Sequence, residues 1–260
     1  QFIYAGSIGE AKKMLLEIIP KDCMIYKYYR GINRDWNSII KPELWLCKAT
    51  CFNDPYDSAF LCNCHSKKIY DPQTEHTLAV EEGLKQYEQD QKSDIMQDAV
   101  FVGCFSERND ALLMWSHYAR NHTGYCIEYE FNKDDMYYSS LHQVRYTKDR
   151  FNISKKDILE GRKDIIDKTV CSKADVWSYE KEWRIVTENY IKTRPSKVDP
   201  KTRYVLDLKD NIKAFYLGAK INEKEKSEII QFAKKNNRIV YQMILSANTY
   251  ELRAERIDNV

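Results

Sequence analysis

The β-prone segments of this chain are short, numerous and separated by helical patterns at irregular intervals. Alternating or continuous apolar runs predict strands, whereas apolar residues three and four apart predict helices. The strands expected before the tail are 24–29, 44–49, 100–105, 125–131, 143–146 and one after 180. This irregular order predicts an α+β fold, with mixed or antiparallel sheets of short strands and interspersed helices, rather than a regular βαβ alternation.

Two helices have expected starting points. Asp110 is the expected N-terminal cap of a helix that runs through Ala119. The tail from 204 to 256 reads as strand, strand, helix, strand and strand, and Asn222 followed by Glu225 has the spacing of a capping pair for its helix.

No linker rich in Gly, Ser or Pro divides the 260 residues, and no repeat is visible. The simplest prediction is therefore a single α+β domain over residues 1–260. Within it, residues 73–99 have a long, polar and charged helical pattern, which predicts a helical insertion with solvated faces.

The charges nearly cancel, with 41 basic and 39 acidic side chains, so no global field would draw the protein to nucleic acid or to a membrane. No run of eighteen apolar residues occurs, and the first thirty residues lack a signal-peptide pattern, so we expect a cytoplasmic protein. The eight cysteines then fit reduced thiols. Zinc ligands at Cys47, Cys51, Cys62, Cys64 and His65 would be poorly spaced, and no metal is expected.

Several common enzyme motifs are missing from the sequence. It contains no G-x-x-x-x-G-K-[ST] loop, no G-x-G-x-x-G turn, no G-x-S-x-G elbow and no H-E-x-x-H helix. P-loop kinases, ordinary dehydrogenases, serine hydrolases and zincin proteases are therefore disfavoured.

Glu180 and Glu182 stand directly before an apolar, β-prone run. In an extended segment their side chains would point the same way and could share one pocket, with Lys181 on the other face. Two such carboxylates can divide the roles of stabiliser and base. The alternative is an edge strand whose charged residues face water, with Glu182 paired to Arg184.

Other segments place polar residues just past a predicted strand or on a predicted helix. Arg30 at a strand end, followed by Gly31, could clamp phosphate or lie on the surface. Ser106 could be functional or a turn residue, and either Asn53 or Asp54 is expected to bond its own backbone in a turn. His117 could line a pocket through a hydrogen bond or be a satisfied core residue.

The chain resembles a bacterial family known as domain of unknown function 2971. The resemblance covers most of the chain from about residue 24 and lies in the segments Tyr26-Lys27-Tyr28, Phe52 to Asp57, Cys104-Phe105-Ser106, Met114 to Ala119, His122 to Glu128, Trp177 to Arg184 and Tyr216 to Ala219. The family name assigns no activity.

The chain is more distantly similar to mono-ADP-ribosyltransferases of the arginine-serine-glutamate type. The aromatic-Arg-Gly, serine and E-x-E motifs of those enzymes have counterparts here, in the same order, at Tyr29-Arg30-Gly31, Phe105-Ser106 and Glu180-Lys181-Glu182. A split sheet like theirs is one form that the predicted fold could take.

This similarity implies NAD as a substrate and a role for each matching residue. Arg30 would hold the NAD phosphates and Ser106 would support the nicotinamide-ribose pocket. Glu182 would bind a ribose hydroxyl and stabilise an oxocarbenium-like charge. Glu180 would orient or deprotonate the acceptor. The remaining expected cofactor-binding residues are Tyr28, His117 and Tyr118. The ring of Tyr118 could stack on nicotinamide.

The function expected from these motifs is that of an NAD-dependent ADP-ribosyltransferase or NAD glycohydrolase-like enzyme, a toxin or phage-defence effector with an unknown protein or nucleic-acid acceptor. One alternative is a metal-dependent nuclease. It would use the carboxylates Asp54, Asp57, Glu128 and Glu130, with help from Lys27 or Arg30. Another is a non-catalytic module that binds a ligand or partner through its tyrosine and tryptophan surface.

Overall fold

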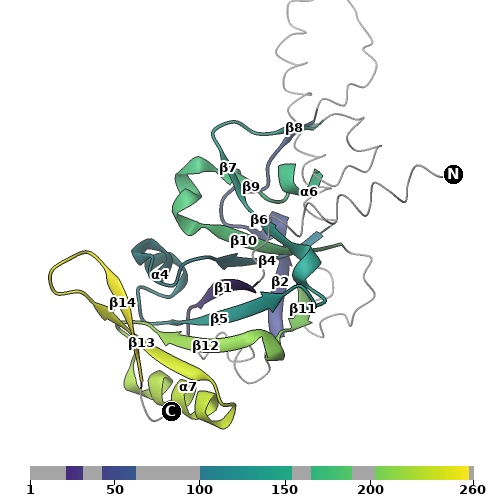
Figure 1. Cartoon of the computed structure of the whole chain (residues 1–260). Helices are drawn as coiled ribbons and strands as arrows, with labels where there is room; N and C mark the ends of the chain where they lie inside the picture. Colours follow the sequence, from purple (N-terminus) through teal and green to yellow (C-terminus); the bar gives the residue numbers. More distant parts are fainter. Residues whose placement is uncertain (1–21, 32–42, 63–99, 154–164, 189–202, 258–260) are drawn as a thin grey trace, which may run out of the picture. The chain divides into compact units, whose positions relative to one another are not determined.

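The computed structural model describes residues 22–31, 43–62, 100–153, 165–188 and 203–257 (Figure 1). The chain divides into two compact units. The first combines Gln1–Leu44, Phe105–Leu141 and Asp207–Val260, and the second combines Trp45–Cys104 and His142–Leu206. The predicted helical insertion at 73–99 lies outside the described residues, and a single domain over the whole chain stays a prediction.

The fold is α+β, as predicted, and is built mostly from strands. In the first unit, five strands lie in the order β1-β5-β12-β13-β14. Their bounds are β1 Asp22–Tyr29, β5 Tyr125–Asn132, β12 Ile212–Leu217, β13 Ile239–Leu245 and β14 Leu252–Arg256. Neighbouring strands are antiparallel except β12 and β13, which are parallel and are joined through a helix, as a parallel pair requires.

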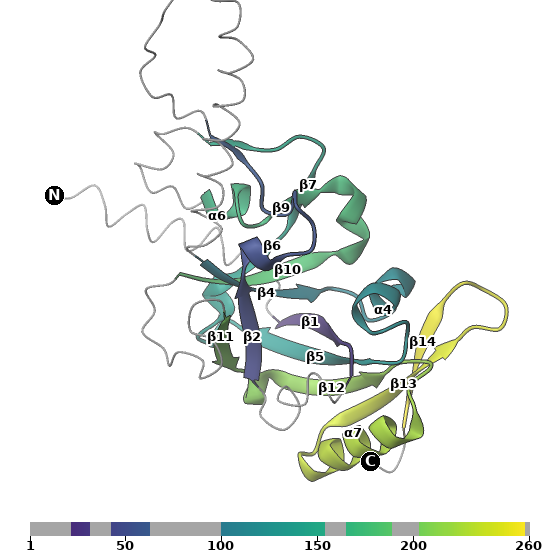
Figure 2. The ribbon, with the colours of Figure 1, turned by 180° about the vertical axis from the view of Figure 1, so that it is seen from behind.

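That helix is α7, Glu223–Lys235, and it lies beside β12 and β13 (Figure 2). The capping prediction is confirmed at its first turn, because Asn222 Oδ1 accepts a hydrogen bond from the backbone N–H of Glu225 at 2.9 Å. Ile229 and Ala233 are buried on its inner face, and Phe232 packs edge-on against Phe215 of β12. The tail therefore has the predicted strand, strand, helix, strand and strand order.

Aromatic side chains fill the core of the first unit. Tyr29 of β1 stacks on Tyr125 at 5.0 Å between ring centroids, and its hydroxyl lies 2.9 Å from that of Tyr129. Phe105, near the end of β4 (Val100–Ser106), meets the rings of Tyr129 and Phe131 edge-on. Alternation along β1 and β5 places their aromatic residues on one sheet face, and this packing accounts for three of the nineteen tyrosines.

The short helix α4, Leu112–Tyr118, follows Ala111 rather than a capping side chain. The prediction that Asp110 caps it is wrong, because this carboxylate forms an ion pair with Arg108 at 2.7 Å instead. After α4 the chain turns through three left-handed residues, Arg120, Asn121 and His122. The next residue but one is Gly124, where a Cβ would lie 2.1 Å from the carbonyl oxygen of Tyr29, so only glycine fits.

The second unit is organised around β4, Val100–Ser106, whose last two residues belong to the first unit. β4 pairs with β2, Glu43–Lys48, and with β10, Glu182–Glu188, while β11, Arg203–Asp207, lies beside β2. β6, Leu141–Gln143, pairs with β10. A cluster of buried apolar side chains packs here, consisting of Ala49, Val100, Val102, Val170, Cys171 and Val186.

Two small parallel pairs complete the second unit. β3, Leu61–Cys62, pairs with β8, Asn152–Ile153, and β7, Arg145–Thr147, pairs with β9, Ser172–Ala174. The strand predicted at 143–146 is interrupted at Val144, whose N–H bonds to the carbonyl of Glu182 at 2.9 Å.

Short helical segments make up the rest of the described structure. They are η1 Ala49–Cys51, η2 Tyr138–Ser140, α6 Ile165–Lys168, η3 Asp175–Glu180 and η4 Lys209–Asn211. Among the residues described, no helix has both the length and the apolar character needed to span a membrane.

Candidate functional site

Glu180 and Glu182 converge, but not for the reason that the sequence suggested. Glu180 is the last residue of η3, Lys181 is left-handed with φ 45°, and Glu182 begins β10. The prediction that both lie in one extended segment is therefore wrong. The two carboxylates still share a partner, because Lys173 Nζ of β9 donates to Glu180 Oε2 at 2.5 Å and to Glu182 Oε2 at 3.0 Å.

Arg184 completes the arrangement around Glu182 and is fully buried, with 0% exposure. Its Nε and Nη2 donate to the two oxygens of Glu182 at 2.8 and 3.1 Å, and Nη2 also donates to Asp57 Oδ2 at 2.8 Å. Its Nη1 donates to the carbonyl of Val170 and to Ser58 Oγ. Glu182 and Arg184 are thus paired, as the edge-strand alternative expected, but they are buried instead of facing water.

We call Asp57, Lys173, Glu180, Glu182 and Arg184 the charge cluster. They come from the loop after η1, from β9, from η3 and from β10, and all five are buried. Three carboxylates and two cations give it a formal charge of −1. A buried charge is tolerated only when it is paired and hydrogen-bonded, and the two cations provide this pairing.

The charge cluster holds Glu182 and Lys173 in their ionised forms. Burial alone would raise the pKa of Glu182, but the charges of Arg184 and Lys173 outweigh it and lower this pKa to about 2. Burial would lower the pKa of Lys173, and the carboxylates of Glu182, Asp57 and Glu180 reverse this and raise it above its ordinary value. Glu182 is consequently a carboxylate at neutral pH and Lys173 is an ammonium.

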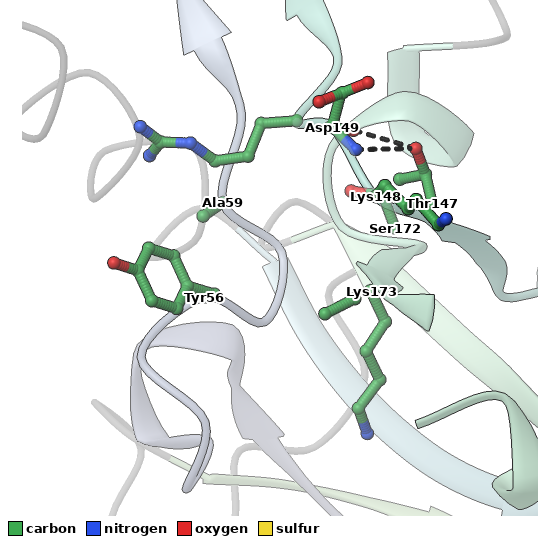
Figure 3. A pocket seen from close by; sticks show the side chains of 9 residues that line it. Tyr56, Ala59, Thr147, Lys148, Asp149, Ser172 and Lys173 are labelled. Carbon is green, nitrogen blue, oxygen red and sulfur yellow. Dashed lines mark hydrogen bonds between the residues drawn. The ribbon is translucent and has the colours of Figure 1, made fainter. Parts of the chain in front are cut away.

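A pocket of about 360 Å³ lies next to the charge cluster in the second unit. Its walls are Tyr56, Ala59, Thr147, Lys148, Asp149, Arg150, Ser172, Lys173 and Ala174. Figure 3 shows Tyr56 on one side of this pocket and the loop from Thr147 to Asp149 on the other. Lys173 belongs to both features, because it lines the pocket while its ammonium group binds the carboxylates.

Local hydrogen bonds shape the two sides of the pocket. Thr147 Oγ accepts from the backbone N–H of Asp149 and donates to its carbonyl at 2.8 Å, which folds the loop between β7 and β8. Opposite, Asp54 Oδ1 accepts from the N–H of Tyr56 at 2.9 Å, so the predicted turn bond of Asn53 or Asp54 is confirmed for Asp54. This turn leaves the Tyr56 ring 64% exposed.

The pocket has two basic side chains that the charge cluster does not use. Lys148 is exposed and Arg150 is half-buried, and within the described ranges neither forms an ion pair with a carboxylate. Guanidinium and ammonium groups next to a tyrosine ring suit a ligand that has both a negative charge and a flat ring.

Three of the residues predicted to bind or convert NAD lie in the first unit. Ser106 and Tyr28 bond to Arg108, and Arg30 follows β1. Ser106 is buried, and its Oγ accepts from the N–H of Arg108 at 3.1 Å. The hydroxyl of Tyr28 donates to the carbonyl of Arg108 at 2.6 Å, and its ring packs edge-on against Trp115. Arg30 is exposed directly after β1. Ser106 and Tyr28 therefore have structural partners.

His117 is exposed on α4, so its interpretation as a satisfied core histidine is wrong. Its ring meets that of Tyr118 edge-on at 6.2 Å. The neighbouring His122 is the more constrained histidine, because its ring stacks on Trp115 and its Nε2 lies 3.1 Å from Ser116 Oγ.

The residues of the predicted NAD site are divided between the two units. Those in the first unit are Arg30, Tyr28, Ser106, His117 and Tyr118, and those in the second unit are Glu180 and Glu182. Their assembly into one site stays a prediction.

The carboxylates of the predicted nuclease site belong to different units, and three of them have partners of their own. Asp57 binds Arg184, while Glu128 and Glu130, in the first unit, bind Tyr216 and Lys213. Across the described residues, no three His, Cys, Asp or Glu side chains form a group that could hold a metal ion.

The possible zinc ligands are only partly described. Cys47 and Cys51 remain thiols, and Cys51 is exposed. Cys64 and His65 lie outside the described residues, as does the side chain of Cys62.

Sequence reasoning missed Lys173, Lys148 and Arg150. Lys173 joins Glu180 and Glu182 across seven and nine residues, a contact made by the β9-η3-β10 path that no local pattern reveals. The spacing of Glu180, Glu182 and Arg184 was the signal that the sequence offered for the charge cluster.

Comparison with known protein families finds a match to part of the chain. Residues 114–185 match the family described as Protein of unknown function (DUF2971). The matched region begins in α4 and ends in β10, so it contains four members of the charge cluster and the β7–β8 loop of the pocket. No curated protein and no solved structure matches the chain.

Proposed function

We propose that the second unit binds a phosphate-bearing nucleotide in the pocket of Tyr56, Lys148 and Arg150, with NAD as the ligand that the sequence motifs favour. The observation that supports this most strongly is the combination of two basic side chains and an exposed tyrosine ring around a volume of about 360 Å³. Arginine binds phosphate oxygens through two parallel hydrogen bonds, and tyrosine stacks on flat rings.

The volume limits how much of the ligand is enclosed. Small-molecule sites commonly occupy about 300–1,000 Å³, so this pocket is at the lower end. It would enclose one nucleotide half of NAD, with the pyrophosphate between Lys148 and Arg150 at the pocket's edge.

The catalytic form of this proposal is cleavage of the bond between nicotinamide and ribose. The C1′–N bond breaks, nicotinamide leaves with the electron pair, and water or an acceptor adds to the positively charged C1′ and gives up a proton. A charge cluster of net −1 beside the pocket favours this developing positive charge. This proposal includes the distant similarity to ADP-ribosyltransferases and their split sheet. Its support is the set of sequence motifs given above.

The geometry favours Glu180 over Glu182 as the carboxylate that meets the ribose. Glu182 already accepts hydrogen bonds from Arg184 Nε, Arg184 Nη2 and Lys173 Nζ, which fixes both of its oxygens. Glu180 accepts from Lys173 Nζ through Oε2 and ends η3, outside β10. In this proposal Glu182 is a positioning residue.

The test is nicotinamide release from NAD by the whole chain, measured by chromatography. Wild type should release nicotinamide, and Glu180→Gln should lower kcat by at least about a hundredfold while KM changes little. Glu223→Gln, an exposed glutamate of α7, is the matched control and should leave release unchanged. Release that is equal in wild type and Glu180→Gln would contradict the assigned role.

A second candidate is a non-catalytic nucleotide-binding module that uses the same pocket. The observation that favours it is the engagement of Glu180 and Glu182 by cations in the buried charge cluster. Binding of NAD with no nicotinamide release over hours would select this candidate. Absence of NAD binding would contradict both the catalytic and the non-catalytic candidate.

A further inference from the structure

The first unit contains a buried carboxylate in an unusual setting. Glu128 of β5 is only 8% exposed, and its hydrogen bond comes from the neutral hydroxyl of Tyr216. In the part of the chain that the structure describes, no lysine or arginine pairs with it. Two residues along the same strand face, Glu130 is less buried and has a lysine partner, Lys213.

The sheet places aromatic rings around Glu128. Tyr26 of β1 lies directly opposite Glu128 in the register, and on its other side Glu128 is opposite Ala214 of β12. One row further along β12, Tyr216 lies beside Tyr241 of β13. Paired and alternate residues of neighbouring strands share a face, so three tyrosines and the carboxylate lie on the same side of the sheet.

The three rings form a connected frame. Tyr216 stacks on Tyr241 at 4.8 Å between centroids and 14° between planes, and Tyr26 meets Tyr216 edge-on at 5.7 Å. Tyr26 and Tyr241 are half-exposed, whereas Tyr216 is buried. The methyl side chain of Ala214 is the smallest neighbour of Glu128 in its row, so this row contributes little bulk over the carboxylate.

The pKa values of two tyrosines in this frame are raised, and Glu128 contributes to both shifts. Burial and the charge of Glu128 raise the pKa of Tyr26 to about 12. Burial and the hydrogen bond to Glu128 also raise the pKa of Tyr216 above its ordinary value, so Tyr216 remains a neutral donor. A cation that replaces water here gains both from the carboxylate and from the ring faces.

We propose that Tyr26, Tyr216 and Tyr241, together with Glu128, form a binding site for a small organic cation that carries an alkylated ammonium group. A buried anion without a cationic partner costs free energy, and a bound cation would supply that partner. The aromatic rings would contact the alkyl groups and attract the charge.

The chemistry of the frame selects this class of cation. Guanidinium has five donors, and leaving several of them unsatisfied on aromatic carbon would be unfavourable. A tertiary or quaternary ammonium has one donor or none and spreads its charge over alkyl carbons. It therefore needs only the carboxylate and the rings.

The experiment compares choline with 3,3-dimethyl-1-butanol, its uncharged carbon isostere, by titration into the whole chain. Binding is followed through the tyrosine ring resonances and by calorimetry. Choline should bind with a Kd at least about tenfold lower than that of the alcohol, because the charge is the feature recognised. Equal affinities, or no shift of ring resonances at high millimolar choline, would overturn the proposal.

Variants of the frame separate charge from packing. Glu128→Gln keeps an oxygen for Tyr216 and should weaken choline binding at least fivefold. Tyr241→Leu should weaken it similarly, whereas Tyr241→Phe keeps the ring and should retain binding. The matched control is Glu130→Gln, which should change the Kd less than twofold. Choline affinity that is unchanged in Glu128→Gln would overturn the proposal. If that variant fails to fold, the comparison of choline with the alcohol on the wild-type protein tests the proposal instead.

Discussion

The two units of this molecule stabilise their interiors in opposite ways. At the centre of the second unit, Arg184 and Lys173 are surrounded by three buried carboxylates. At the centre of the first unit, the ring of Tyr29 stacks on that of Tyr125, and the hydroxyls of Tyr29 and Tyr129 form a hydrogen bond at 2.9 Å. One interior depends on the pairing of opposite charges, and the other depends on contact area supplemented by neutral hydrogen bonds.

This difference predicts different sensitivities to substitution. Removing one member of a buried ion pair leaves another charge without a partner, which costs about 3–5 kcal/mol. Removing one hydroxyl from an aromatic core costs about 1–2 kcal/mol, because the ring contacts remain. The second unit should therefore be fragile at single positions, and the first should be tolerant.

The largest expected effect follows from Arg184→Met. Three carboxylates would then share Lys173 alone, so we expect a loss of about 3–5 kcal/mol in the free energy of unfolding, or failure of the second unit to fold. The measurement is urea unfolding followed by circular dichroism and fluorescence. Arg108→Met, which breaks the exposed pair with Asp110, is the matched control and should change stability by less than about 1 kcal/mol. Similar losses in both variants would remove the distinction between the units.

The second effect is a pH dependence of stability that arises from Glu182. Its pKa is lowered from 4.5 to about 2, against the opposing effect of burial, by Arg184 and Lys173. A carboxylate with a lowered pKa in the folded protein stabilises the fold above pH 4.5, and this contribution is lost as the pH falls toward 2. The contribution is roughly 3 kcal/mol.

The check for this pH dependence is the stability difference between wild type and Glu182→Gln, measured by urea unfolding between pH 7 and pH 2.5. The difference should be largest at neutral pH and should shrink below about pH 4.5, because the protonated wild type then resembles the variant. A constant difference over this range would show that Glu182 is not held ionised by its neighbours.

A smaller effect is expected in the aromatic interior. Tyr29→Phe and Tyr129→Phe each leave one buried hydroxyl without the partner seen at 2.9 Å, so each should cost about 1–2 kcal/mol in unfolding free energy. The double variant should lose less than the sum, because no orphaned hydroxyl remains. Chemical denaturation of the four proteins gives this cycle, and additive losses would mean that the two hydroxyls act independently.

The smallest effect is expected at a helix end. Asn222→Ala removes the side-chain acceptor for the N–H of Glu225 and should cost about 1 kcal/mol in thermal or chemical unfolding. The control is Lys224→Ala, because Lys224 is exposed in the first turn of the same helix. Asn237→Ala would not serve, because Asn237 has a left-handed backbone that alanine disfavours. A loss in Asn222→Ala no larger than in Lys224→Ala would show that the cap contributes nothing.

Periodicity predicted the elements whose own residues determine them. The strands at 24–29, 44–49, 100–105 and 125–131 and the helix after Asn222 are confirmed within one or two residues, since alternation and a cap are local signals. The predicted start of α4 was wrong, because the Asp110 carboxylate pairs with Arg108 instead of capping the helix.

The candidate site was harder to predict because its residues meet through tertiary contacts. The proximity of Glu180 and Glu182 was correctly expected, but it depends on the left-handed Lys181 and on Lys173 rather than on strand alternation. The pocket residues Lys148 and Arg150 come from a loop whose position follows from the pairing of β7 with β9. No spacing in the sequence encodes that pairing.

The most direct test of the proposed function is calorimetric titration of NAD and of ADP-ribose into the whole chain, wild type beside Arg150→Met, with Arg253→Met as the matched exposed control. We predict that wild type and Arg253→Met bind both ligands equally well and that Arg150→Met binds them at least tenfold more weakly. Absence of binding to wild type, or an affinity that Arg150→Met leaves unchanged, would contradict the assignment of this pocket as a nucleotide site.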